Sequence, residues 1–244
     1  MLIVEGLSKS FNKKLSLFPN KKNTSIALKN INFKINSGDR LAILGHNGSG
    51  KSTLLKTLFG SITPDNGQIN WKRNNFPLSD GLRKVSAIFN NNDRSFFWRL
   101  TVRENLNYFN SLNNINVKAE DICDTYGNLS IKNILDVPFM SLSAGQKKKV
   151  ALFRGLIKDP EIVFFDEFTD SLDINNRIKL KNLIKEEISN KLKKTIIWVT
   201  HSIDEAEEIC NKILILEKGS IKFFDNCLNG SFKNTDKVKA LLIK

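Results

Sequence analysis

The sequence predicts an α/β fold in which a mainly parallel sheet is covered by helices on both faces. Short apolar segments at 41–44, 162–165 and 195–199 have the length of buried strands. Between them lie polar segments whose apolar residues recur every three or four positions, which indicates amphipathic helices. Strands that alternate with helices in this way are typical of a parallel sheet buried on both sides.

Length and composition exclude several classes of protein. The 244 residues can form one large domain or two small ones. No apolar run approaches the roughly 20 residues of a membrane-spanning helix, and the first ten residues do not resemble a secretory signal. Three widely spaced Cys residues predict neither a disulfide framework nor a zinc site, which favours the reducing cytoplasm.

The chain is basic, with 38 Lys and Arg against 25 Asp and Glu and a formal net charge of +13. Such an excess occurs in proteins that bind nucleic acids or anionic membrane surfaces. The basic residues are spread along the chain in short runs, which indicates solvated surfaces. We therefore expect no nucleic-acid partner.

The first 90 residues contain mainly strand signals. In the segment 27–36, Leu28 and Phe33 belong to a near-alternating apolar pattern that predicts a half-buried strand. A polar loop is expected at 12–25, and Gly60 is expected to end a helix at 51–59. The other expected strands are 2–4, 41–44 and 85–89.

Helical spacing replaces the strand signals from about residue 90 to 158. This change predicts a mainly helical insertion at 90–158, with 1–89 and 159–244 forming the core. Further along, Ser202 and Glu205 have the spacing of a capping box at a helix start. The remaining expected elements are strands at 162–165, 195–200, 212–217 and 221–224 and helices at 176–193 and 202–210.

Residues 45–53 carry the strongest motif. They read GHNGSGKST and match G-x-x-x-x-G-K-[ST], with a strand expected before them and a helix after them. Glycines let backbone N–H groups approach phosphate oxygens, and the helix N-terminus adds partial positive charge. Lys51 is expected to reach the β- and γ-phosphates, and Ser52 to bind Mg²⁺. The expected nucleotide-binding residues of this P-loop are Gly45, His46, Asn47, Gly48, Ser49, Gly50, Lys51, Ser52 and Thr53.

Two acids follow the apolar strand at 162–165. Asp166 and Glu167 come at its carboxyl end, the edge at which ligands bind in open α/β sheets. We expect Asp166 to hold Mg²⁺, directly or through water. We expect Glu167 to orient or deprotonate the water that attacks the γ-phosphate.

A third motif completes an ordered set. Residues 142–146 read LSAGQ and precede Asp166, and His201 follows a strand after Glu167. With the P-loop, this set resembles the ATP-binding cassette (ABC) ATPases over nearly the whole chain. The resemblance implies a P-loop NTPase core with an antiparallel β subdomain and a helical insertion. It also implies ATP and Mg²⁺ as cofactors, and ATP hydrolysis.

Cassettes of this family bind ATP between two protomers arranged head to tail. The resemblance implies that Ser143 and Gly145 contact the γ-phosphate held by the opposite chain. It assigns His201 to the γ-phosphate and to the catalytic acid, and Asp173 to the loop that crosses the dimer interface. The signature residues are Ser143, Ala144, Gly145 and Gln146.

The chain departs from the family pattern at several positions. Asn90 stands where Gln is usual and is expected near Mg²⁺ or its water; Ala144 replaces the first signature glycine, and Phe168 replaces a proline. No phosphate ligand, metal ligand or base is lost, so we expect ATPase activity. Phe11 matches the aromatic residue that stacks on adenine, with Phe18 as the alternative.

Three consecutive aromatic residues, Phe96, Phe97 and Trp98, lie in a polar segment. Exposed aromatic residues often anchor protein partners, and the family places a membrane subunit against this region. The alternative is that all three pack inside the helical region. The segment 94–100 also resembles cassettes that serve exporters of the polysaccharide and lipid (ABC-2) type.

The resemblance implies the ATP-hydrolysing subunit of an ABC transporter, with export as the expected direction. It implies a second cassette in a homodimer, separate transmembrane permease subunits and a position at the cytoplasmic face of the cell membrane. Two alternatives stay open. The net charge suggests a soluble ABC ATPase that acts on nucleic acid, and Asn90 and Ala144 suggest a regulatory cassette that binds ATP without hydrolysis.

Overall fold

The computed structural model describes residues 1–13, 23–72, 74–90, 95–115, 131–228 and 231–232. The chain divides into two compact units, one of Met1–Ser86 with Thr195–Lys244 and one of Ala87–Lys194. Among the described residues, none of the helices combines the length and the apolar character needed to cross a bilayer.

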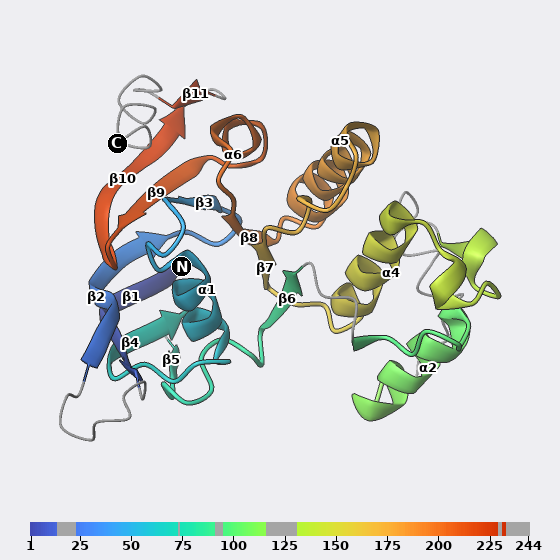
Figure 1. The fold of residues 1–244 in the computed structure, drawn as a ribbon, viewed down its shortest axis with the longest axis horizontal. Helices are drawn as coiled ribbons and strands as arrows, with labels where there is room; N and C mark the ends of the chain where they lie inside the picture. Colours follow the sequence, from blue (N-terminus) through green and yellow to red (C-terminus); the bar gives the residue numbers. More distant parts are fainter. Residues whose placement is uncertain (14–22, 73, 91–94, 116–130, 229–230, 233–244) are drawn as a thin grey trace. The chain divides into compact units, whose positions relative to one another are not determined.

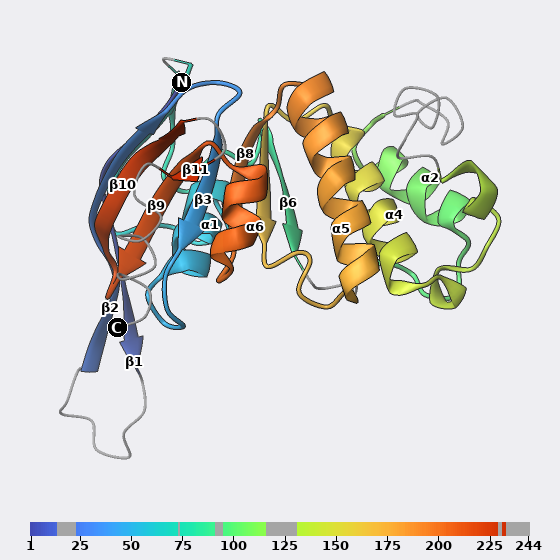
Figure 2. The same ribbon diagram turned by 90° about the horizontal axis from the view of Figure 1, so that it is seen from above.

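The first unit contains an antiparallel sheet and part of a mainly parallel one (Figures 1 and 2). The antiparallel sheet has the order β2-β1-β4-β5, formed by β1 (Leu2–Lys13), β2 (Asn23–Ile35), β4 (Asn66–Trp71) and β5 (Asn74–Phe76). In the other sheet, β3 (Arg40–Leu44) runs parallel to both β8 (Thr195–Val199) and β9 (Lys212–Glu217). The order continues from β9 to β10 (Ser220–Leu228) and β11 (Ser231–Phe232), both antiparallel to their neighbours.

Several elements of this unit match their expected bounds. The helix α1 (Lys51–Phe59) ends at Gly60, whose left-handed backbone lets its N–H group bond the carbonyls of Lys56 and Thr57. The loop expected at 12–25 is wrong at both ends, because β1 and β2 stay paired through Phe11 and Ser25 as far as Lys13 and Asn23. The strands β4 and β5 were not expected, since Asn and Gly interrupt their apolar pattern.

The start of helix α6 (Ile203–Ile209) has one of the two hydrogen bonds of a capping box. The Ser202 hydroxyl accepts a hydrogen bond from the Glu205 N–H, as expected. The Glu205 carboxylate does not return to the Ser202 backbone. It accepts bonds from Trp198 Nε1 at 3.2 Å and Thr200 Oγ1 at 2.6 Å, so the expected capping box is wrong in its second half. A buried indole N–H needs a partner, and Glu205 supplies it.

The second unit is mainly helical and also contains two neighbouring strands, β6 (Ser86–Asn90) and β7 (Ile162–Asp166). Helix α4 (Ala144–Leu156) contacts both α2 (Val102–Leu112) and α5 (Ile174–Leu183), as both views show (Figures 1 and 2). A π-helix, Ile184–Lys191, continues α5, and short 3₁₀ turns occupy Lys132–Ile134 and Phe139–Ser141.

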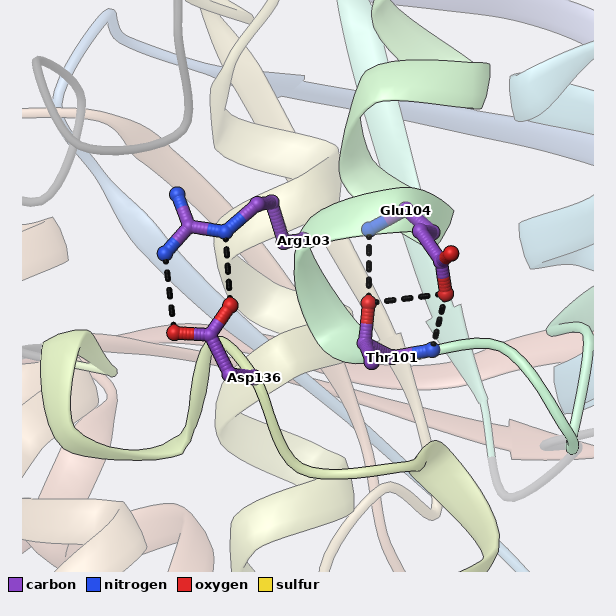
Figure 3. A network of polar contacts seen from close by, with 4 residues as sticks. All are labelled: Thr101, Arg103, Glu104 and Asp136. Atoms are coloured by element: carbon purple, nitrogen blue, oxygen red, sulfur yellow. Dashed lines mark hydrogen bonds and ion pairs between the residues drawn. The ribbon is translucent and has the colours of Figure 1, made fainter.

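The start of α2 carries a complete capping box and an ion pair (Figure 3). The Thr101 hydroxyl accepts from the Glu104 N–H, and the Glu104 carboxylate accepts from the Thr101 N–H at 2.7 Å. The Thr101 bonds lower the pKa of Glu104. Arg103 makes a two-pronged pair with Asp136, at 2.8 and 3.1 Å. These contacts fix where the chain enters α2.

The compact units divide at 86/87 and 194/195, whereas the sequence suggested boundaries near 90 and 158. Aromatic packing joins β6 and β7 within the second unit. The Phe89 ring stacks on Phe165 with centroids 5.3 Å apart and lies 5.7 Å from Phe168. All three side chains are buried. Residues close to both expected boundaries therefore share one core.

Gly155 in α4 provides the space for this packing. A Cβ atom there would lie 2.3 Å from Phe89 Cζ. We expect Gly155→Ala to lower the free energy of unfolding by about 1–3 kcal/mol, because the added Cβ atom displaces the buried Phe89 ring from its stacked position on Phe165. Urea unfolding measures this change. Phe89→Leu in the same chain should remove most of the penalty. A more stable Gly155→Ala protein, as helix propensity alone would favour, would contradict the packing argument.

Candidate functional site

The loop between β3 and α1 follows a path that only glycine permits at two points. Gly45 has φ of 148°, and a Cβ atom there would lie 2.4 Å from the Leu216 carbonyl oxygen. Gly50 has φ of 108°, and a Cβ atom there would lie 2.6 Å from the Ala27 carbonyl oxygen. The loop therefore runs in close contact with the main chain of β9 and β2, which holds it at the start of α1.

Lys51 is the first residue of α1, and its side chain lies inside this loop. It is 5% exposed, and Nζ donates to the carbonyl oxygens of Gly45 at 2.7 Å and His46 at 3.1 Å. The ammonium group and the positive end of the helix macrodipole therefore meet at one point. Such an arrangement is an anion site. Ser52 follows in the same helical turn.

A cavity of about 340 Å³ adjoins the loop and is lined by Gly45, His46, Asn47 and His201. His201 lies two residues after the end of β8. Because β8 is the neighbour of β3 in the sheet, His201 lies beside the loop that follows β3. The chain has two His residues, and both line this cavity. Ser49 Oγ, buried in the loop, has no hydrogen-bond partner among the residues that the structure describes. Sequence reasoning treated Ser49 only as a member of the motif.

In the second unit, the two expected acids lie at the end of β7. Asp166 is the last residue of the strand. Glu167 leaves it with φ of 50°, a left-handed conformation that is unusual for a residue with a side chain. The Asp170 N–H donates to the Glu167 carbonyl at 3.3 Å, and Phe168 is fully buried. The backbone of Glu167 is thus held between a strand and a buried anchor.

Asn90 is the last residue of β6 and is exposed. Its carbonyl oxygen accepts a hydrogen bond from Lys148 Nζ at 3.3 Å. Lys148 lies on α4 and is 2% exposed. It stands in a run of three lysines, a pattern that is typical of a solvated surface, so its burial could not be predicted from the sequence. Burial of one of the three is visible only in the structure.

The signature residues lie at the N-terminus of α4. Ser143 caps the helix, and its hydroxyl and the Gln146 side chain exchange bonds with each other's backbone N–H groups. Asp173 caps α5 in turn, and the bond from the Asn176 N–H lowers its pKa. The Asn176 amide also donates to Asp173 at 2.6 Å, and a Cβ atom at Gly145 would lie 3.0 Å from Asn176 Oδ1. Asn176, which the sequence did not single out, thus brings these residues together.

The three aromatic residues divide into one buried and two exposed side chains. The expectation of exposure is wrong for Phe96, which is 5% exposed and stacks on Phe139 with centroids 4.3 Å apart. Arg154 lies over the Phe96 ring at 4.2 Å, and burial lowers the pKa of its guanidinium to about 10. Phe97 and Trp98 are about half exposed, at 45% and 49%. Of the three rings, Phe96 therefore belongs to the core of the helical region.

Phe11 lies near the end of β1 and is 41% exposed, with Lys9 Nζ 5.5 Å from its ring. Its ring is accessible to a ligand, as adenine stacking requires. Phe18, the alternative, lies outside the described residues. Lys51, the glycine loop and His201 belong to the first unit. The two acids and the signature helix belong to the second unit.

Comparison with known proteins identifies the family of the chain. Residues 28–170 match the family model described as ABC transporter. The chain is 36% identical over 203 residues to the energy-coupling factor transporter ATP-binding protein EcfA1 of Mycoplasma mobile, covering 81% of this chain and 73% of that protein.

Two solved structures resemble the fold. One is cbiO1 from Clostridium perfringens, described as part of the ABC transporter complex cbiONQ, with 26% identity, a TM-score of 0.77 and coverage of 98% of this chain and 91% of that one. The other is the ATP-binding cassette MJ1267 in its ADP conformation, with 21% identity, a TM-score of 0.80 and coverage of 99% and 97%. The chain therefore belongs to the ABC transporter family, and it is an ATP-binding and ATP-hydrolysing subunit of a transporter.

Proposed function

We propose that the residues described above form the Mg-ATP site of this subunit. The observation that carries the proposal is the buried Lys51 ammonium group, held by two loop carbonyls at the start of α1. A site that concentrates positive charge at inward-facing backbone suits the phosphates of ATP. His201, on the cavity beside the loop, contacts the γ-phosphate in this proposal.

The remaining roles follow from side-chain chemistry. Ser52 and Asp166 offer hydroxyl and carboxylate oxygens, the ligands that Mg²⁺ prefers, and Asn90 offers an amide to the metal's water. Bound Mg²⁺ supplies charge neutralisation to the phosphates. Glu167 accepts a proton from the attacking water, and Lys51 stabilises the charge that develops on the phosphate oxygens.

A second cassette completes the site in this proposal. Ser143 and Gly145 meet the γ-phosphate held by a second copy of the chain, and Asp173 lies at the contact between the copies. The clustering of these residues at two neighbouring helix starts supports the proposal, because both starts attract anionic oxygen.

Separate membrane-embedded subunits carry the cargo. The relatives are named for an energy-coupling factor transporter and for the complex cbiONQ, and we propose that this chain serves a transporter of that kind. The half-exposed Phe97 and Trp98 face the membrane subunit, which keeps the cassette at the cytoplasmic face of the membrane. Neither name mentions export, so the export direction and the polysaccharide or lipid cargo stay predictions from the segment 94–100.

The test combines purification with an activity assay. The tagged chain, expressed in its native membrane background, is expected to copurify with membrane subunits and to release phosphate from ATP only when Mg²⁺ is present. Copurified nucleic acid that dissociates steeply with salt would favour the nucleic-acid alternative. ATP binding without phosphate release, with or without membrane subunits, would favour the regulatory alternative.

Two glycines of the loop provide a matched pair for ATP binding. Gly45→Ala is expected to weaken ATP binding at least about tenfold, because the added Cβ atom meets the Leu216 carbonyl and displaces the loop. Gly48→Ala is expected to weaken it less. Its φ of 79° also disfavours a side chain, but no atom of the described residues lies within 4 Å of its Cβ position. Titration with a fluorescent ATP analogue measures both affinities. Equal losses would contradict the role of the β9 contact.

A further inference from the structure

Lys148 joins two loops of the proposed site within the second unit. Its ammonium nitrogen lies 4.7 Å from the centroid of the Phe168 ring, on the side of α4. The same nitrogen donates to the Asn90 carbonyl oxygen at 3.3 Å. Lys148 is only 2% exposed and Phe168 is fully buried, so the contact with the ring is shielded from water and from salt. Cation–π contacts are strongest under such conditions.

Phe168 transmits this contact to the neighbouring acid. It directly follows Glu167 and packs against Phe89 at 5.7 Å and Phe165 at 5.5 Å. Two aromatic rings, Phe89 and Phe165, and the Lys148 ammonium group therefore determine where the Phe168 side chain lies. Any shift of that ring would move the peptide unit that it shares with Glu167.

Glu167 needs such an anchor. Its φ of 50° is left-handed, a conformation that is unfavourable for a residue with a side chain. A strained residue keeps its conformation only where its surroundings hold it from both sides. The strand β7 holds one side, and Phe168 holds the other. A proline at position 168 would restrict the backbone through its own ring, whereas Phe168 depends on contacts.

We propose that Lys148 is a positioning residue for ATP hydrolysis, which holds the Phe168 ring and thereby keeps the Glu167 carboxylate directed at the attacking water. The inference rests on the proposed role of Glu167. Lys148 touches neither nucleotide nor water in this role. It also ties the end of β6 to the signature helix through Asn90, so one ammonium group sets the spacing of three segments.

Substitutions of Lys148 separate charge from hydrogen bonding. Lys148→Met keeps the apolar stem, and we expect kcat to fall about tenfold while KM for ATP changes less than about twofold. Lys148→Arg keeps a cation that stacks on the ring and should stay within about threefold of the wild-type kcat. Lys148→Gln keeps an N–H donor for Asn90 without charge and should lie between them. Lys158→Met, on an exposed lysine after α4, is the matched control.

Fluorinated phenylalanines at position 168 isolate the cation–π contact. One, two and three ring fluorines weaken the negative face of the ring in steps and change its shape little. In the wild-type chain, log kcat should fall in proportion to the number of fluorines. In the Lys148→Met chain, the same series should be flat. A purely structural role for Phe168 would not produce this dependence.

The outcomes distinguish the inference from the proposed function. All rates are measured as phosphate release by the full chain at saturating ATP, beside Glu167→Gln. If the wild type is no faster than Glu167→Gln, the role of Glu167 and the inference both fail. If the wild type is faster but Lys148→Met retains the wild-type kcat, or the fluorine series is flat in the wild-type chain, only the inference is overturned.

Discussion

Glu167→Gln is expected to lower the rate of phosphate release about 10²–10⁴-fold while ATP still binds. The amide has nearly the shape of the carboxylate, but it cannot accept the proton of the attacking water. The substitution should leave the backbone in place, because β7 and the buried Phe168 hold it on both sides of this position. Single-turnover phosphate release measures the chemical step directly.

The control is Glu186→Gln, the same chemical change at an exposed position of the same unit, which should leave the rate unchanged. ATP affinity of Glu167→Gln should stay within about twofold of the wild type, since the phosphates are bound elsewhere in the proposal. A rate within about threefold of the wild type would show that another group accepts the proton.

Lys51→Met is expected to weaken ATP binding by roughly 10²-fold or more, because it removes the buried ammonium group that we propose faces the phosphates. The methionine chain has the length of the lysine stem, so the space inside the loop stays filled. The carbonyls of Gly45 and His46 lose their donor, and the loop loses its concentrated positive charge. Competition against a fluorescent nucleotide gives the affinity.

Lys56→Met on the same helix provides the comparison, since Lys56 is exposed and lies in the last turn of α1. It should bind ATP as the wild type does. Thermal unfolding without nucleotide should show that both variants fold. An affinity for Lys51→Met equal to that of Lys56→Met would remove Lys51 from the binding site.

Local signals explain what the sequence predicted well. The helix α1 has its bounds marked by Gly50 and Gly60, which permit backbone that other residues avoid, and its prediction is confirmed. The strand β9 is a continuous apolar run between polar residues, and its expected bounds match. The P-loop segment contains both kinds of signal, since an apolar strand precedes its glycines and a helix follows them.

Long-range packing explains what the sequence missed. Lys148 and the lysines on either side of it cannot be told apart in the sequence, and tertiary contacts bury only Lys148. Phe96 lies in a polar segment and was expected to be exposed, but its ring is buried in a stack with Phe139. Glu205 has the spacing of a cap, yet the buried Trp198 indole competes for it. In each case a partner distant in sequence decides the outcome.

Asn176 has a consequence for how two copies of the chain would recognise each other. Its amide is bonded to Asp173 and abuts Gly145, so the first turns of α5 and α4 form a single rigid edge. A smaller or larger residue in place of Asn176 is therefore expected to change the distance between the two helix starts, and with it the fit of a second copy to both of them.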